Sequence, residues 1–360
     1  MSPAGGLVAV RDWRNSSKVI LSLGSVVMPV PSVQSYIMEQ RATVRQHYIP
    51  ACYLARFTAQ GTRNSPFFVH SLDGTIRQST PNSEGFECHY HTIDVEGLAP
   101  DHLETIFQKI EGPACALFKT LSENPGRSLT ESDKDTLLMF FCVQAARLPQ
   151  SRKKYVASVV DCGRAFAEEV AHSTTFFQKV TAIAAKHGMA VDSDSATHKK
   201  LREAVDGGHI SRTVGKTESA IGMFRLAEAI LDVLNGMHYT LWYSDAASFV
   251  CSDYPVGLFY SLSADNPLED PLSVETPKVT LLTSSIYMPL AYNVAVVFHQ
   301  GENVPTAQHA NERMVGIVNA ITVSHAQRFV CSFDGDFVCV LPDKQLGNAK
   351  QAVEAVMSFA

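Results

Sequence analysis

The hydrophobic residues change their spacing once along this chain, and that change limits the possible folds more than any other feature. Between residues 103 and 234, apolar side chains recur every three or four positions, which is the spacing of helices with one buried face. From Tyr239 onward they alternate in short runs, which is the spacing of strands. Helices followed by a run of strands predict an α+β fold, with a helical middle packed on a mainly antiparallel β portion.

Within the helical region, the apolar stripe from Leu103 to Leu121 predicts one long helix, with a kink at Pro113 because proline removes a ladder hydrogen bond. Thr130 is suited to cap a second helix. The interior of that helix, residues 137–143, is apolar on every side, so we expect it to be buried. Further helices are predicted over residues 153–187, 196–206 and 218–235.

Strand-like runs occur at both ends of the helical region. An N-terminal hairpin is predicted over 66–76, with a turn at Asp73-Gly74. After the helices we expect 239–243 to pair with 248–251, further strands at 279–288 and 293–299, and a helix over about 306–325. A last hairpin is predicted from 329–333 and 337–341, around Asp334-Gly335.

No linker-like break divides the chain between residues 45 and 341, so this range is predicted to be a single large domain. Residues 1–37 are expected to be a disordered leader or a mis-assigned start, because their apolar stretch is too interrupted for a signal peptide or a membrane span. Residues 342–360 are expected to form a C-terminal helical tail.

Composition narrows the class of protein. The 360 residues are 46% hydrophobic and 18% charged, which is typical of a globular protein with a substantial core. The net charge of −6 argues against a broad nucleic-acid surface. Eight scattered cysteines form no C-x-x-C pair, and most lie in apolar runs. We therefore expect buried free thiols, a cytoplasmic location and no membrane contact. The sequence assigns no cofactor or oligomeric state.

His47 lies in the stretch where the ordered chain begins, Arg45 to Phe57. Ile49 precedes Pro50 and is biased toward extended backbone, while Tyr53, Leu54 and Phe57 have helical spacing. His47 is therefore expected just before a short helix, where it is either a structural histidine or a catalytic base.

Two further pairs of candidates belong to the predicted helices. Glu104 and Glu111 are seven residues apart, on one edge of their stripe, and form either a solvated flank or a pair of carboxylates. Gln144 and Arg147 share a face at the end of the buried helix. A guanidinium leaving a buried helix needs either a carboxylate partner or a bound anion.

Asp253 follows Ser252 at a predicted strand end before Pro255, a position used either for chemistry or for local turn bonding. The run Cys88 to Asp94 alternates, so it predicts a strand that exposes His89 and His91 on one face. These histidines are either solvent-facing or packed, or two ligands of a metal whose third ligand the sequence does not locate.

Four stretches together resemble a bacterial family known as the domain of unknown function 4238, in order and spacing from about residue 45 to 333. They are His47-Tyr-Ile-Pro50, Leu103-Glu104 to Ile110-Glu111, Gln144-Ala-Ala-Arg147-Leu-Pro149 and Ser252-Asp253-Tyr254-Pro255. The third position of the last motif is usually Asn in the family, and Thr often precedes the Pro of the third motif, where this chain has Leu148. The resemblance implies a shared fold and carries no activity.

Two functions fit these residues. If His47, Glu111, Gln144, Arg147 and Asp253 converge, the protein is expected to be a hydrolase of a small anionic, phosphoester-like substrate, with a histidine base, a carboxylate and an arginine clamp. The alternative is a non-catalytic module that senses a ligand or binds a partner, in which the same residues only brace the core. Convergence around an open pocket favours the enzyme, and self-paired burial favours the module.

Overall fold

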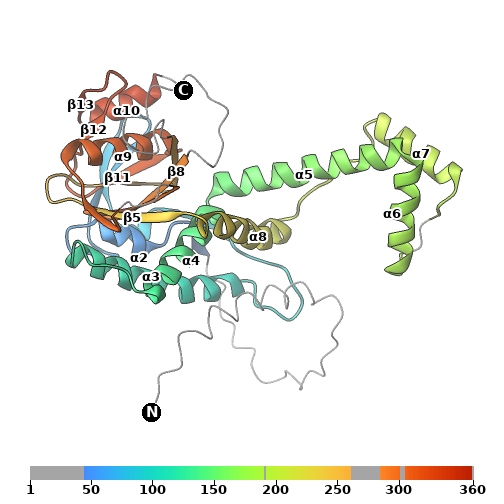
Figure 1. The fold of residues 1–360 in the computed structure, drawn as a ribbon, viewed down its shortest axis with the longest axis horizontal. Helices are drawn as coiled ribbons and strands as arrows, with labels where there is room; N and C mark the ends of the chain where they lie inside the picture. Colours follow the sequence, from blue (N-terminus) through green and yellow to red (C-terminus); the bar gives the residue numbers. More distant parts are fainter. Residues whose placement is uncertain (1–43, 190–191, 261–283, 301–304, 359–360) are drawn as a thin grey trace, which may run out of the picture.

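The fold is α+β, as predicted, with a mixed body and a helical arm that leaves it (Figure 1). In this computed structural model, residues 44–189, 192–260, 284–300 and 305–358 are described. The predicted leader, 1–37, lies outside these ranges. The helices are α2 (Ala51–Leu54), α3 (His102–Glu123), α4 (Glu131–Arg147), α5 (Pro149–His172), α6 (Thr174–Lys186), α7 (Ser195–Asp206), α8 (Lys216–Leu234), α9 (Glu312–His325) and α10 (Ala349–Met357), with 3-10 turns η1 (Ala55–Phe57) and η2 (Pro81–Ser83).

The larger sheet has the strand order β10-β5-β9-β8-β7, and only the pairing of β10 with β5 is parallel. Its strands are β5 (His238–Tyr243), β7 (Gly257–Tyr260), β8 (Ser284–Ala291), β9 (Val294–His299) and β10 (Ala307–His309). Strand β9 is buried along its whole length because both faces of the sheet are covered. Val296 and Phe298 face the core that α3 and α4 share, whereas Ala295 and Val297 face α9.

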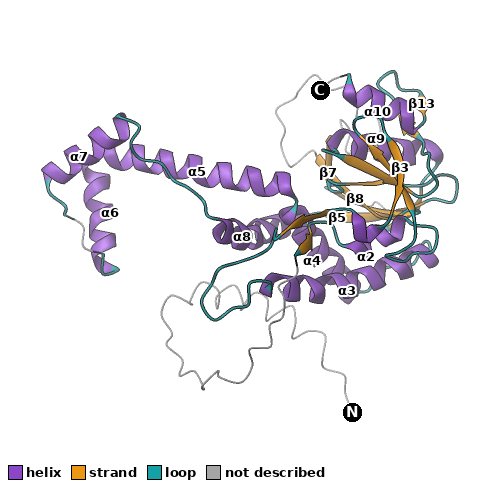
Figure 2. Ribbon diagram, turned by 180° about the vertical axis from the view of Figure 1, so that it is seen from behind, coloured by secondary structure: helices purple, strands orange, loops and turns teal. Residues whose placement is uncertain are grey.

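The smaller sheet has the order β3-β2-β11-β6 and is antiparallel throughout. It is built from β2 (Phe67–Ser71), β3 (Ile76–Ser79), β6 (Cys251–Ser252) and β11 (Phe329–Ser332). Two short ribbons complete the β structure, one of β1 (Arg45–His47) with β4 (Phe86–Cys88), the other of β12 (Cys339–Val340) with β13 (Leu346–Gly347). Figure 2 shows the strands gathered in the body, with α5, α6 and α7 lying apart from them.

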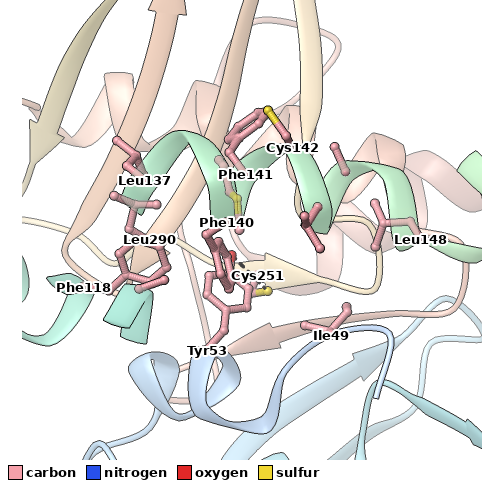
Figure 3. Packing of buried hydrophobic residues seen from close by; sticks show 14 of the residues in the cluster. Ile49, Tyr53, Phe118, Leu137, Phe140, Phe141, Cys142, Leu148, Cys251 and Leu290 are labelled. Carbon is pink, nitrogen blue, oxygen red and sulfur yellow. Dashed lines mark hydrogen bonds between the residues drawn. The ribbon is translucent and has the colours of Figure 1, made fainter. Parts of the chain in front are cut away.

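Helix α4 fills the centre of the body, as its apolar sequence predicts. Phe140 meets Tyr53 of α2 and Phe118 of α3 at ring-centroid distances of 5.7 and 5.0 Å (Figure 3). Phe141 meets Phe298 of β9 at 5.0 Å. Full burial of an aromatic side chain stabilises the fold by roughly 2–3 kcal/mol. Thr130 caps the helix in a capping box with Asp133, which confirms the predicted start.

Several predicted pairings between strands are wrong. The strand at 239–243 pairs with β9 and β10. Its predicted partner, 248–251, forms a strand only at its end, as β6, which joins the smaller sheet. The predicted last hairpin does not form either, because β11 lies between β2 and β6 and β12 pairs with β13. Local alternation identifies a strand but says nothing about which distant strand supplies the ladder of hydrogen bonds.

Some predicted element boundaries are also wrong. The stretch predicted as one helix over 306–325 begins as strand β10, and α9 starts only after Asn311, whose side chain accepts a hydrogen bond from the Met314 amide. The predicted helix over 153–187 divides at Ser173, which caps α6 in the same way. Helix α3 continues through Pro113. At the C-terminus, α10 packs on α9, with Ala352 and Val353 buried.

The prediction of free, buried thiols is wrong for four of the eight cysteines. Cys52 of α2 and Cys115 of α3 form a disulfide, and Cys88 and Cys162 are exposed. The two bonded cysteines are 63 residues apart, so no spacing in the sequence indicates their pairing.

Candidate functional site

Three of the sequence motifs meet where α3, the end of α4 and the chain after β1 come together. Strand β1 ends at His47, and the extended Ile49-Pro50 step then leads into α2. Leu148 is extended because it precedes Pro149, so α4 must end at Arg147. Arg147 is therefore the last residue of a buried helix, and it lies beside α3.

Arg147 is held entirely by other side chains of the protein. Its side chain is 1% exposed, and its Nη1 donates to Glu111 Oε1 at 2.7 Å. Its Nε and Nη2 both donate to Gln144 Oε1, at 2.9 and 2.7 Å, and its guanidinium lies 5.2 Å above the ring of Phe107. The guanidinium therefore has the carboxylate partner that the sequence argument required.

Gln144 joins this ion pair to the backbone before α2. While its Oε1 accepts from Arg147, its Nε2 donates to the carbonyl of Tyr48 at 3.0 Å. The Tyr90 hydroxyl donates to the Arg147 carbonyl at 2.9 Å, which satisfies one of the orphan acceptors at the end of α4. The structure thus brings His47, Glu111, Gln144 and Arg147 into one cluster.

His47 lies in this cluster with one ring nitrogen unpaired. Burial lowers its pKa, the negative charge of Glu111 opposes this, and the charges of Arg147 and Arg63 lower the pKa further. Its Nε2 is buried and has no hydrogen-bond partner within the described ranges. The imidazole is therefore neutral at pH 7, which leaves a proton acceptor or donor available to a ligand.

Glu104 is the second group with an unused buried atom. Burial, and secondly the charge of Glu111 on the same helix, raise its pKa to about 7, although Arg147 lowers it. Its Oε1 has no partner in the part of the chain that the structure describes. The environments of Glu104 and Glu111 therefore differ, because only Glu111 forms the ion pair with Arg147.

His91 also belongs to the cluster, contrary to its predicted exposure. Strand β4 ends at Cys88, and a positive φ of 55° at His89 turns the chain, so the predicted strand over 88–94 is wrong. His89 is exposed, while His91 is buried 4.6 Å from the ring of Phe107. Its Nε2 is 3.3 Å from the His47 carbonyl, and its Nδ1 has no partner among the described residues.

Asp253 lies apart from this cluster, in the β portion of the body. Its Oδ1 accepts from the Gln327 amide at 2.8 Å, and its own amide donates to the Phe329 carbonyl at 3.2 Å. Burial raises its pKa, and the backbone amides that it accepts from oppose the shift. Its charge is the second cause, after burial, of the raised pKa of Tyr48, the residue that follows His47. Asp253 holds the chain that enters β11.

Sequence reasoning offered Glu104 as half of a carboxylate pair and His91 as a possible metal ligand, but included neither among the expected catalytic residues. It gave Tyr48 no role. Tyr48 follows His47 directly, and Glu104 was visible only as one of a spaced pair. His91 was assigned to the wrong surface because alternation says nothing about a turn at His89. Within the described ranges, no group of three or more His, Cys, Asp or Glu side chains is arranged to hold a metal ion.

Residues 45–336 match the family described as "Protein of unknown function (DUF4238)", and the chain belongs to that family. Comparison with curated proteins gives no match, and neither does comparison with solved structures. None of the helices in the described residues is both long and apolar enough to cross a membrane.

Proposed function

We propose that this protein is a hydrolase of a small anionic, phosphoester-like substrate, with acid–base chemistry at His47 and Glu104. One observation carries the proposal. His47 Nε2, His91 Nδ1 and Glu104 Oε1 are buried without a hydrogen-bond partner in the described part of the chain, beside a fully bonded ion pair. Buried polar atoms are normally satisfied, so three such atoms in one cluster favour a bound ligand or water that completes them.

The two unpaired groups are suited to opposite roles. A carboxyl with a pKa of about 7 is present in both protonation states near neutral pH, so Glu104 can give a proton to a leaving group. The neutral His47 can accept one from water. Arg147 and Gln144 are positioning residues in this proposal, because their bonds fix α4 against Glu111 and the Tyr48 carbonyl.

The anionic character of the substrate is inferred from the charge of Arg63 beside the cluster. Arg63 is exposed, and its charge acts on His47. A guanidinium there attracts a phosphate or carboxylate and can bind it with two hydrogen bonds. A cytoplasmic location stays part of the proposal because six of the eight cysteines are free thiols, although the Cys52–Cys115 disulfide argues for an oxidising compartment.

A ligand-sensing module is the second candidate, and the burial of Arg147 favours it. The guanidinium is 1% exposed and its Nε, Nη1 and Nη2 all have protein acceptors, which is the self-paired arrangement expected of a brace. In this alternative the same cluster binds an anionic ligand but does not hydrolyse it.

The test is an assay of the full chain with p-nitrophenyl phosphate and bis(p-nitrophenyl) phosphate across the pH range, beside calorimetry with inorganic phosphate. The proposal predicts turnover that falls about 100-fold or more in His47→Ala and in Glu104→Gln. His89→Ala is the matched control, because this histidine is exposed, and it should keep full activity. Phosphate binding without turnover would support the sensing module. Neither binding nor turnover by the folded protein would overturn both.

A further inference from the structure

Helices α5, α6 and α7 form an arm that extends well beyond the body (Figures 1 and 2). The inner contacts of the arm are built like a small core. Phe177 of α6 stacks on His198 of α7 at 4.4 Å, and His198 Nε2 lies 3.0 Å from the Val170 carbonyl of α5. Arg202 also bonds the Ala171 carbonyl at 3.1 Å. The arm is therefore a defined structure and not a loose extension.

The outer side of the arm is apolar and uncovered in the isolated chain. Phe166 is 52% exposed, Ile183 56% and Met189 56%, and Phe166 contacts Phe176 at 5.6 Å. Phe176 and Ile183 are seven residues apart, so they share one face of α6, whereas Phe177 faces α7. We call Phe166, Phe176 and Ile183 the arm patch; Met189 follows the end of α6. Large apolar side chains gathered on one surface mark an interaction site.

The charges around the arm patch are divided between its two helices. Helix α6 carries Lys179 and Lys186 and no acidic side chain. On α5, Glu168 and Glu169 follow Phe166, and Arg164 before it forms an ion pair with Asp161. All these charged side chains are exposed. A symmetric contact between two copies can place the acidic end of one α5 over the basic α6 of the other, twice. The charged residues that flank the arm patch can thus pair with their counterparts on a second copy while the apolar patches meet.

We propose that two copies of this chain associate through their arm patches, across a two-fold axis. The contact would cover the exposed aromatic and aliphatic side chains of both copies and pair their opposite charges at the rim, as in other isologous interfaces. Cys162 provides a native reporter, because it is an exposed free thiol one helical turn before Phe166. The proposal is independent of hydrolysis, since none of these residues belongs to the His47 cluster.

The experiment is sedimentation velocity on the full chain across a wide range of concentrations, with Ile183→Glu as the test variant. We expect a dimer, and a dissociation constant raised about 30-fold or more by this substitution. Ile76→Glu is the matched control, since Ile76 is 53% exposed but lies on strand β3, and it should leave the dimer intact. A bifunctional thiol reagent should also join two wild-type chains and fail with Cys162→Ser.

Two results would overturn the proposal. One is a wild-type chain that stays monomeric at every concentration, and the other is a dimer that Ile183→Glu does not weaken. Because a charged residue could disturb the small core of the arm, circular dichroism and the unfolding temperature of each variant are compared with wild type. The milder Phe166→Ser, on α5, tests the same contact without changing α6. The p-nitrophenyl phosphate assay of Ile183→Glu and Phe166→Ser tests hydrolysis separately, so failure of the dimer proposal and failure of the hydrolase proposal can be told apart.

Discussion

Arg147 shows how a single buried charge can organise residues that are far apart in the sequence. Its guanidinium draws together α3, α4 and, through Gln144, the backbone after β1. A buried ion pair of this kind adds little stability compared with a well-packed apolar pair, but breaking it leaves one charge without its partner. The pair is therefore more important for the position of its neighbours than for the overall free energy of folding.

Replacing Glu111 by Gln should be strongly destabilising for this reason. We expect the free energy of unfolding to fall by roughly 3 kcal/mol, because Arg147 keeps its charge and loses its carboxylate. Urea unfolding at neutral pH measures the effect. Glu123→Gln on the same helix is the control, since its Lys119 partner is exposed and 3.8 Å away, and it should cost less than about 1 kcal/mol. Equal midpoints for the two variants would contradict the prediction.

Glu104 should make the stability of the protein depend on pH. Its pKa is about 7 when folded, against an ordinary value of 4.5, so the folded state binds this proton more tightly than the unfolded state. A raised carboxyl pKa means that the free energy of unfolding falls as the pH rises from 4.5 to about 7. Glu104→Gln removes this fall, so at higher pH it should be relatively more stable, by roughly 1–2 kcal/mol for a partly solvated group.

The measurement is a series of urea titrations from acid to neutral pH for wild type and Glu104→Gln. The two curves of unfolding free energy against pH should separate steadily through this window. Curves that stay parallel would show that the carboxyl is ordinarily solvated, and Glu104 would lose its proposed role as an acid.

At the scale of elements, α2 is too short to be stable alone, with four residues from Ala51 to Leu54. Burial of Tyr53 and Leu54 holds it in place, as does the disulfide from Cys52 to Cys115 of α3. Glu111 is one helical turn before Cys115 on α3, and His47 precedes α2 closely. The disulfide therefore connects α3, which carries Glu111, to the short helix that follows His47.

Removing this disulfide should lower the free energy of unfolding by about 3 kcal/mol, because it closes a loop with a sequence separation of 63. Cys115→Ser and added reductant should have the same effect, and reductant should do nothing further to the variant. Alkylation of the denatured wild type, followed by mass spectrometry, should count six thiols before reduction and eight after it. Eight thiols without reductant would mean that the bond does not form in solution.

At the scale of the whole molecule, the spacing of hydrophobic residues predicted those features that depend only on neighbouring residues in the sequence. The α+β class, the burial of α4 and the cap at Thr130 follow from spacing and side-chain chemistry within a few residues. Part of the site was predictable in the same way, because Gln144 and Arg147 are one turn apart. Their partners were not, since Glu111 and Tyr48 lie 36 and 96 positions away from the atoms they bind.

Strand order and the arm were beyond sequence reasoning for a related reason. Strand β11 forms hydrogen bonds with β2, more than two hundred residues earlier, and no short pattern encodes such a pairing. The helical spacing of residues 149–206 predicts helices but does not say that they leave the body. The positions of Phe166 and Ile183 became informative only when the structure showed that each is more than half exposed.

The position of β11 has a consequence for how the protein is made. Because β11 lies between β2 and β6, the smaller sheet is incomplete until residues 329–332 have left the ribosome. During translation, β2 has only β3 beside it, and its other edge stays open while all the intervening helices are synthesised. A nascent chain in this state exposes a strand edge that other chains can pair with, so its need for chaperones should end late in synthesis.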